Sequence, residues 1–157
     1  MAMVERLRRV LEEQKVPYEV AAHSERYTTQ EVAATAHVSG RALAKVVMVK
    51  TAGGFAMTVL PAACRVNVQR LRDLLGDPAA TIAEESEFRG LFPDCEAGAM
   101  PPFGNLYNIP VYVDDDLATC DRITFEAGNH HEVVTMQYAD FERLVQPRKA
   151  EFCAHAA

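Results

Sequence analysis

The sequence has no segment typical of a membrane or exported protein. No run approaches the ~20 apolar residues that a helix needs to span a bilayer. The N-terminal residues MAMVERLRRVLEEQ are charged and lack the apolar stretch of about 7–15 residues found in a signal peptide. We therefore expect a cytoplasmic protein with no membrane partner.

The sequence also lacks an excess of positive charge. Its 16 lysines and arginines are outnumbered by 22 aspartates and glutamates, so the formal net charge is −6. Domains that coat nucleic acid usually carry a basic face and a high pI. The charge balance excludes a protein of that class and predicts no DNA partner. It leaves room for a local basic patch that serves one RNA end.

Motifs for metal binding and covalent catalysis are missing. The four cysteines, Cys64, Cys95, Cys120 and Cys153, form no C-x-x-C pair and no zinc-binding spacing. We expect them to be free thiols in a reducing compartment. The sequence has no G-x-G-x-x-G, Walker, H-E-x-x-H or G-x-S-x-G motif. We therefore expect no metal, no cofactor and no serine or metal hydrolase site.

The length of 157 residues fits one domain, which we place at residues 1–147, with a loose C-terminal tail at 148–157. Apolar periodicity, caps and turn residues predict the elements. Helices are expected at 3–15, 28–37, 67–76, 84–92 and 138–145. Strands are expected at 18–23, 42–50, 55–62, 80–83, 109–115, 122–128 and 131–136. Helices and strands are interspersed without a regular βαβ repeat, and two hairpins are expected, which predicts an α+β fold with a mixed sheet.

Lys45 lies within the valine-rich strand ALAKVVMVK, on the same face as Val47 and Val49. Lysine is rarely buried unless it is paired. One interpretation is a strand-end lysine whose amine reaches water. The other is a cation at a pocket wall that holds a phosphate or a carbonyl oxygen.

His130 follows Gly128 and precedes His131 beside the strand HEVVTM. Adjacent strand residues point to opposite faces, so the two imidazoles cannot easily share one metal. His130 is either solvated at a turn or faces a pocket, because the glycine permits close backbone approach. The run Asp114 to Asp116 follows VYV and is expected to be a solvated turn rather than a cation site.

The segment EAGAMPPFGN, residues 96–105, is a stiff apolar loop. Gly98 and Gly104 can adopt positive φ, and Pro101 and Pro102 fix φ and remove two N–H groups. Backbone donors held in this way suit an oxyanion hole. The alternative is a rigid turn that packs Met100 and Phe103 into the core. The residues alone leave both possibilities open.

These three segments, in this order and strand context, resemble the YbaK/ProX editing-domain family, free-standing relatives of the editing insert of bacterial prolyl-tRNA synthetases. The similarity runs from about residue 5 to 146. Lys45 matches the family's key lysine, Gly98 and Pro102 fit its G-x-x-x-P loop, and Gly128 and His130 fit its A-G-x-H segment.

The resemblance implies a mostly antiparallel, curved sheet with packed helices. It also implies a trans-editing deacylase that hydrolyses the ester of a mischarged tRNA, without a cofactor. A small amino acid such as alanine, cysteine, serine or threonine and a proline tRNA are the expected substrate. The acceptor 3′ end of aminoacyl-tRNA is then the partner, and an aminoacyl-tRNA synthetase is a second one. Lys45, Lys50 and nearby arginines are expected to bind that end weakly, in a salt-sensitive manner.

The resemblance also suggests roles within the site. Lys45 would hold the 3′ end, backbone N–H groups between Gly98 and Gly104 would bind the oxyanion, and His130 would line the pocket or orient a substrate group. A ribose hydroxyl of the terminal adenosine would position or activate the water. With Pro102 in the loop, the other expected substrate-binding residues are Val47, Met57, Val59, Met100, Pro101, Phe103, Gly104, Gly128 and Asn129.

Two other functions remain open at this level. The same fold could bind a nucleotide or an aminoacyl-tRNA without turnover. A thiol-based enzyme would depend on Cys64 or Cys95, but neither lies in a motif that lowers a thiol pKa, and Arg65 beside Cys64 is the single adjacent cation. The thiol interpretation is therefore the weakest of the three.

Overall fold

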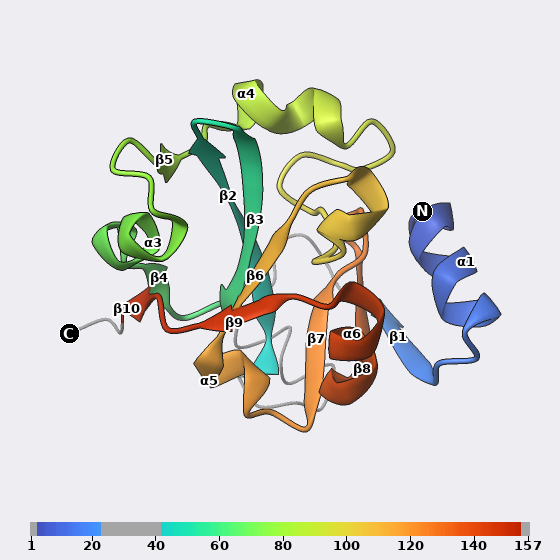
Figure 1. The fold of residues 1–157 in the computed structure, drawn as a ribbon. Coiled ribbons are helices and arrows are strands. Elements are labelled where there is room, and N and C mark those ends of the chain that lie inside the picture. The colour runs from blue at the N-terminus through green and yellow to red at the C-terminus, as the bar shows by residue number, and fades with distance from the viewer. Residues whose placement is uncertain (1–2, 23–41, 155–157) are drawn as a thin grey trace.

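The computed structural model describes residues 3–22 and 42–154 (Figure 1). The helices are α1 (Glu5–Glu13), α3 (Val68–Leu75), α4 (Glu85–Phe88), α5 (Asp115–Ala118) and α6 (Tyr138–Val145), with 3-10 turns η2 (Arg89–Leu91) and η3 (Gly104–Tyr107). The strands are β1 (Tyr18–Ala22), β2 (Ala44–Thr51), β3 (Gly54–Pro61), β4 (Arg65–Val66), β5 (Thr81–Ile82), β6 (Val111–Asp114), β7 (Arg122–Glu126), β8 (Glu132–Gln137), β9 (Arg148–Ala150) and β10 (Cys153–Ala154). The helix expected at 28–37 lies outside the described residues.

The sheets are mixed, as the α+β prediction requires. The largest has the order β5-β2-β3-β6-β9, in which β6 runs parallel to both β3 and β9. A second, antiparallel sheet has the order β1-β8-β7. A parallel bridge between Leu43 and Thr124 places the start of β2 beside β7. The α+β fold class is therefore confirmed.

Capping and turn residues lie where the sequence predicts the ends of a helix and a hairpin. The side chain of Asn67 accepts a hydrogen bond from the Arg70 N–H at the start of α3, and Gly76 ends this helix in the left-handed region at φ 64°. The Gly53–Gly54 turn joins β2 to β3, whose register pairs Thr51 with Gly54. Both faces of β2 are apolar because each is covered: Met48 lies in the main core, and Val49 packs on the other face with Leu71 and Ala80.

The main apolar core lies where α1 and α6 pack against strands of both larger sheets. Phe103 is at its centre and is fully buried. Its ring centroid lies 5.7 Å from that of Phe125 and 5.6 Å from that of Phe141. No helix within the described residues is long and apolar enough to cross a membrane.

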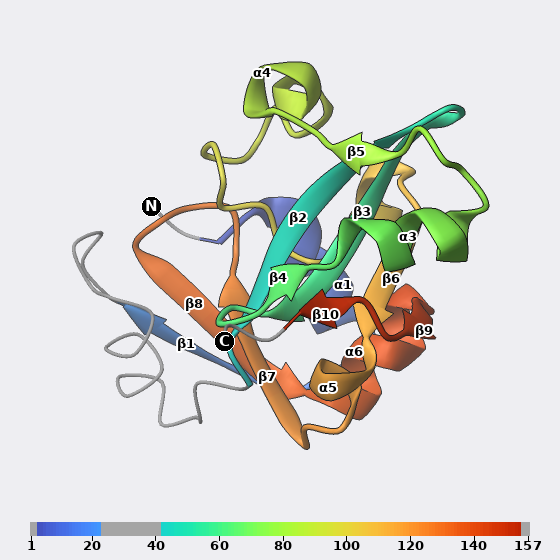
Figure 2. The same cartoon turned by 90° about the vertical axis from the view of Figure 1, so that its left-hand side faces the viewer.

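The C-terminal segment differs from the expected loose tail. Residues 148–150 form β9 beside β6, and 153–154 form β10 beside β4, which Figure 2 shows as adjacent ribbons. Phe152 between them is fully buried. The prediction of a loose tail is wrong for residues 148–154, because these short strands pair with elements that lie far away in the sequence.

Asp114 also differs from its expected place in a solvated turn. It is only 1% exposed, and its carboxylate accepts hydrogen bonds from the backbone N–H groups of Phe152 at 2.9 Å and Cys153 at 2.8 Å. The same side chain caps α5 by accepting from the Asp116 N–H. A buried carboxylate is stabilised by such donors. Asp114 therefore anchors the C-terminal segment.

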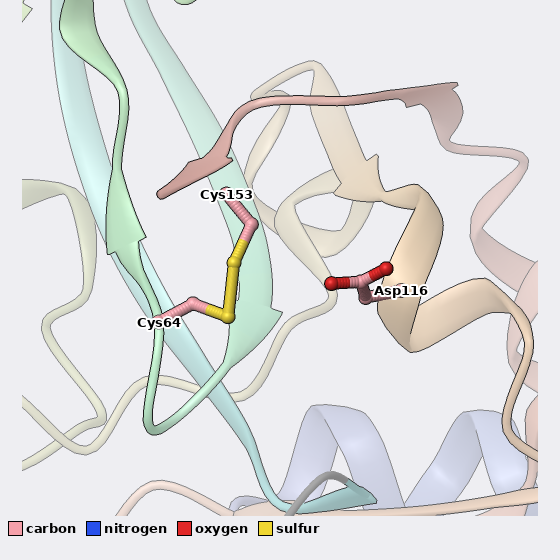
Figure 3. Close-up of side chains that lie close together, drawn as sticks. All are labelled: Cys64, Asp116 and Cys153. Carbon is pink, nitrogen blue, oxygen red and sulfur yellow. A yellow bond between two sulfur atoms is a disulfide. The ribbon is translucent and has the colours of Figure 1, made fainter. Parts of the chain in front are cut away.

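Cys64 and Cys153 form a disulfide across 89 residues of sequence (Figure 3). The expectation of four free thiols is therefore wrong for this pair, while Cys95 and Cys120 take no part in a disulfide. One donor atom each from Cys64, Cys153 and Asp116 lies within 4.8 Å of the others. With the sulfurs joined to each other, neither cysteine offers the thiolate that a metal site needs.

Candidate functional site

The first half of the loop, residues 96–99, is held against the segment that follows β7. The Glu96 N–H donates to the Gly128 carbonyl at 2.8 Å, and the Gly128 N–H donates to the Ala99 carbonyl at 2.8 Å. The Nε2 of His130 lies 2.6 Å from the carbonyl oxygen of Ala97. The structure thus brings together the two segments that the sequence singled out as loop and histidine motif.

Both ring nitrogens of His130 have a close oxygen neighbour. Its Nδ1 lies 2.9 Å from the carboxylate of Glu126. Burial disfavours the charged ring, but the Ala97 carbonyl and the carboxylates of Glu126 and Glu96 outweigh this effect and raise the pKa of His130. Each ring nitrogen thus faces an oxygen acceptor of the protein. The geometry of His130 is that of a residue that holds the loop.

Sequence reasoning did not single out Glu126. Its carboxylate is partly exposed and pairs with His130, four residues later, across the turn after β7. On β7, Glu126 is two residues beyond Thr124 and shares its face. No familiar motif contains this glutamate, and only the turn geometry brings it to the histidine.

Lys45 is half-buried on β2, two residues beyond Leu43 and therefore on the same face. The bridge from Leu43 to Thr124 sets this face of β2 beside the face of β7 that carries Glu126. Burial, followed by the charge of Arg65, lowers the pKa of Lys45. No ion pair among the described residues involves Lys45, which leaves a partly desolvated cation at this edge.

Lys50 differs from Lys45. Its Nζ lies 2.8 Å from the Glu87 carboxylate, which raises the pKa of this exposed lysine. The expectation that Lys50 helps to bind an RNA end conflicts with this pairing, because its charge is already matched. Lys50 lies five residues beyond Lys45 and so on the other face of β2.

The predicted pocket walls do not all share one face of the sheet. β2 pairs Lys45 with Leu60 and Met48 with Met57, so Met57 faces away from Lys45. Val59 shares the face of Met57, and both are fully buried in the main core. Val47 shares the face of Lys45. Met57 and Val59 were expected to line a pocket with Lys45, but they lie on the opposite face of the sheet from it.

The second half of the loop belongs to the core. Met100, Pro101, Pro102, Phe103 and Gly104 are buried. A Cβ on Gly104 would lie 2.8 Å from both the Ile109 carbonyl oxygen and Val111 Cγ2, so this position needs glycine for packing. The expectation that Phe103 lines a substrate pocket is not met, since its ring is enclosed by aromatic neighbours. The interpretation of the loop as a packing turn therefore holds for this half.

Gly98 and Gly128 both adopt positive φ, 78° and 102° respectively. Gly98 is exposed, and its N–H donates to no backbone carbonyl among the described residues. A Cβ on Gly128 would lie 1.9 Å from Val4 Cγ2. Gly128 does allow a close approach to its backbone, as expected, but the group that approaches is the Val4 side chain of the N-terminal segment. Gly98 presents the open backbone donor.

Asn129 has a structural role in this arrangement. It is fully buried, and its Oδ1 accepts hydrogen bonds from the backbone N–H groups of His131 at 2.8 Å and Glu132 at 3.0 Å. Such a turn orders the backbone that leads into β8. The side chain expected to bind substrate is thus engaged in shaping the His130 turn.

The structure disfavours the thiol interpretation. Cys64 is bonded to Cys153. Burial raises the pKa of the Cys95 thiol to about 11, and the Tyr107 hydroxyl lies 3.4 Å from its sulfur. A thiol with this pKa is almost entirely protonated near neutral pH and is a poor nucleophile.

A hollow of about 400 Å³ lies between the β2–β3 turn and the end of α3. None of the predicted site residues lines it. Its only acidic group, Asp77, accepts hydrogen bonds from the N–H groups of Ala52 and Ala79 at 2.7 Å and 2.9 Å. The candidate site is instead the region where the loop with the exposed residues Ala97 and Gly98, the Glu126–His130 pair and the Lys45 face of β2 adjoin.

Solved structures share this fold at low sequence identity. A candidate trans-editing enzyme for prolyl-tRNA synthetase has a TM-score of 0.81 at 19% identity, covering 98% of this chain and 99% of its own. The hypothetical protein APE2540 has a TM-score of 0.83 at 20% identity, covering 96% and 100%. Similarity at this level of identity shows the fold alone.

A comparison with curated protein sequences finds no match. The sequence model of the aminoacyl-tRNA editing domain matches residues 23–144, which is most of the chain. This range contains Lys45, the glycine- and proline-rich loop and the Glu126–His130 pair. The chain therefore belongs to the aminoacyl-tRNA editing domain family.

Proposed function

We propose that this protein is a trans-editing deacylase, which hydrolyses the ester that links a wrong amino acid to a tRNA. The observation that carries the proposal is the loop of residues 96–99, held by His130 with the exposed N–H of Gly98 beside it. Membership in the editing domain family supports this chemistry. So does the fold shared with a candidate trans-editing enzyme for prolyl-tRNA synthetase.

The proposed reaction needs no protein nucleophile. An aminoacyl ester is already activated, so placing a water and stabilising the oxyanion suffices. The water oxygen bonds to the carbonyl carbon, the ester C–O bond breaks, and the ribose oxygen leaves with a proton as a hydroxyl group. A neighbouring ribose hydroxyl of the terminal adenosine positions the water. The N–H of Gly98 binds the oxyanion in this scheme, and Pro102 keeps the loop in shape.

Lys45 and His130 have different roles in the proposal. The partly desolvated ammonium of Lys45 binds a phosphate or carbonyl oxygen of the acceptor 3′ end, since it has no carboxylate partner among the described residues. His130 positions the loop through Ala97, and both of its ring nitrogens face acceptor oxygens of the protein rather than an open site. The substrate hydroxyl is therefore the proton relay in this mechanism.

The finer assignments rest on the family resemblance and the charge balance. We propose that the amino acid is small, such as alanine, cysteine, serine or threonine, that the tRNA is a proline tRNA, and that the protein acts in the cytoplasm. The net charge of −6 predicts weak, salt-sensitive tRNA binding. A partner synthetase would supply the missing affinity.

A panel of aminoacylated tRNAs tests the proposal. We expect deacylation of at least one small-amino-acid ester, and a loss of at least about tenfold in kcat/KM for Lys45→Ala. Lys50→Ala is the matched control on the same strand, because Lys50 is paired with Glu87. Full activity of Lys45→Ala would remove the role of that lysine. Binding of the charged tRNA without turnover of any ester would indicate a binding module instead.

A further inference from the structure

The two ends of the glycine- and proline-rich loop are joined by a polar contact. Asp94 precedes the loop and Tyr107 ends the turn that follows it. The Tyr107 hydroxyl donates to Asp94 Oδ1 at 3.0 Å. This contact closes the chain on itself across 13 residues, with the Gly98 turn within the closed segment.

Arg6 of α1 contacts both ends of the closed segment. Its Nε lies 3.0 Å from Asp94 Oδ2, and its Nη1 donates to the Leu106 carbonyl at 3.3 Å. Its guanidinium carbon lies 4.6 Å from the centre of the Tyr107 ring. A guanidinium has the planar, multi-donor shape for an ion pair, a carbonyl hydrogen bond and stacking at once, whereas lysine does not.

The residue before α1 contacts the segment after β7, which also supports the loop. Val4, directly before α1, donates its N–H to the Ala127 carbonyl at 2.9 Å and packs on Gly128. Gly128 in turn bonds to Glu96 and Ala99 of the loop. The start of α1 therefore contacts both the base of the loop and the segment that holds its tip.

We infer that Arg6 is a positioning residue of the proposed deacylase: it clamps Asp94, Leu106 and Tyr107 so that the Gly98 N–H is held where the oxyanion forms. This inference rests on the proposed function. Arg6 itself touches no reacting atom. Its loss leaves Lys45 and the acceptor-end contacts in place, so the transition state is affected more than substrate binding.

Arg6→Ala is the principal variant, and Arg9→Ala is its control. Arg9 is on the same helix, is 66% exposed and pairs with Glu5. We expect Arg6→Ala to lower kcat by about 10- to 100-fold, the scale of a small misplacement of catalytic groups. We expect KM to change by less than about threefold, because ground-state binding is retained. Arg9→Ala should match the unmodified protein in both constants.

Further measurements separate positioning from folding. Ethylguanidinium added to Arg6→Ala should restore part of kcat, whereas ethylammonium should not, because only the planar ion refits the clamp. Tyr107→Phe removes the hydroxyl contact to Asp94, and its loss should not add to that of Arg6→Ala, as expected for one network. An unchanged kcat in Arg6→Ala would overturn the inference. So would a loss that disappears once the fraction of folded protein is matched.

Amide hydrogen exchange tests the clamp independently of turnover. Arg6→Ala should speed exchange at Ala99 and Leu106, whose N–H groups are hydrogen-bonded within the closed segment, while Arg9→Ala should not. If no ester is hydrolysed but this exchange increases, the proposed function fails and the clamp stands. If esters are hydrolysed and the exchange is unchanged, the clamp fails and the proposed function stands.

Discussion

Reduction of the Cys64–Cys153 disulfide should destabilise the protein without unfolding it. The bond joins β10 to the residue before β4 and closes 89 residues of chain. For a loop of this length, the chain-entropy treatment gives about 4–5 kcal/mol of stabilisation, and measured values are often smaller. At about 2–4 °C per kcal/mol for a chain of this size, the melting temperature should fall by on the order of 10 °C.

The reduced protein should remain folded because the C-terminal segment has other anchors. Phe152 is buried, and the Asp114 carboxylate accepts two backbone hydrogen bonds from this segment. Disulfides are rare in reducing compartments. In a reducing compartment, the dithiol form with β10 still docked is therefore the expected form.

Thermal unfolding followed by circular dichroism, with and without a dithiol reductant, measures the effect. Cys153→Ser should melt like the reduced protein and should show no further change with reductant. Cys120→Ser is the control, since Cys120 takes no part in the disulfide, and it should keep the full response to reductant. A fall of less than about 1 °C on reduction would refute the loop-entropy argument. A thiol assay on protein unfolded without reductant should detect two reactive thiols. Detection of four would refute the disulfide itself.

Three further predictions concern the loop and its supports. Gly128→Ala should cost about 2–5 kcal/mol of unfolding free energy in a urea titration, because the new Cβ overlaps Val4 and φ is positive; if Val4→Ala restores none of this loss, the clash is not the cause. Phe103→Ala should cost about 3–5 kcal/mol in the same titration, and a loss below about 1 kcal/mol would mean that the ring is not a core residue. The raised pKa of His130 means that its stabilisation is complete below its ordinary value of 6.5 and is lost as pH rises through the raised value. The stability difference between the unmodified protein and His130→Gln should therefore shrink between about pH 6 and 8, and a difference that grows with pH would contradict the assignment.

Much of the fold could be predicted from local patterns. Asn67 and Gly76 bound α3 as expected, and Gly53–Gly54 forms the expected hairpin. These features depend on backbone preferences of single residues and on periodicity, which act over a few residues. The boundaries of the strands β9 and β10 could not be found in this way, since each is only two or three residues long and exists through its partner.

The candidate site was predictable in part. The sequence identified Lys45, the loop and His130, and the structure shows the loop bonded to His130. It could not assign Met57 to the face opposite Lys45, because alternation defines two faces without showing which one is covered by the core. Nor could it find Glu126, whose pairing with His130 depends on the conformation of one turn.

The sequence by itself determined the α+β class, the hairpins, the helices near residues 5–13, 68–75 and 138–145, and the residue types available for chemistry. Only the tertiary structure decided that the loop EAGAMPPFGN is divided, with its tip held by His130 and its proline half packed in the core. It also decided that Arg6 reaches Asp94 and that Cys64 reaches Cys153. Such contacts join residues more than 80 positions apart, and their existence depends on how whole elements pack rather than on any local preference.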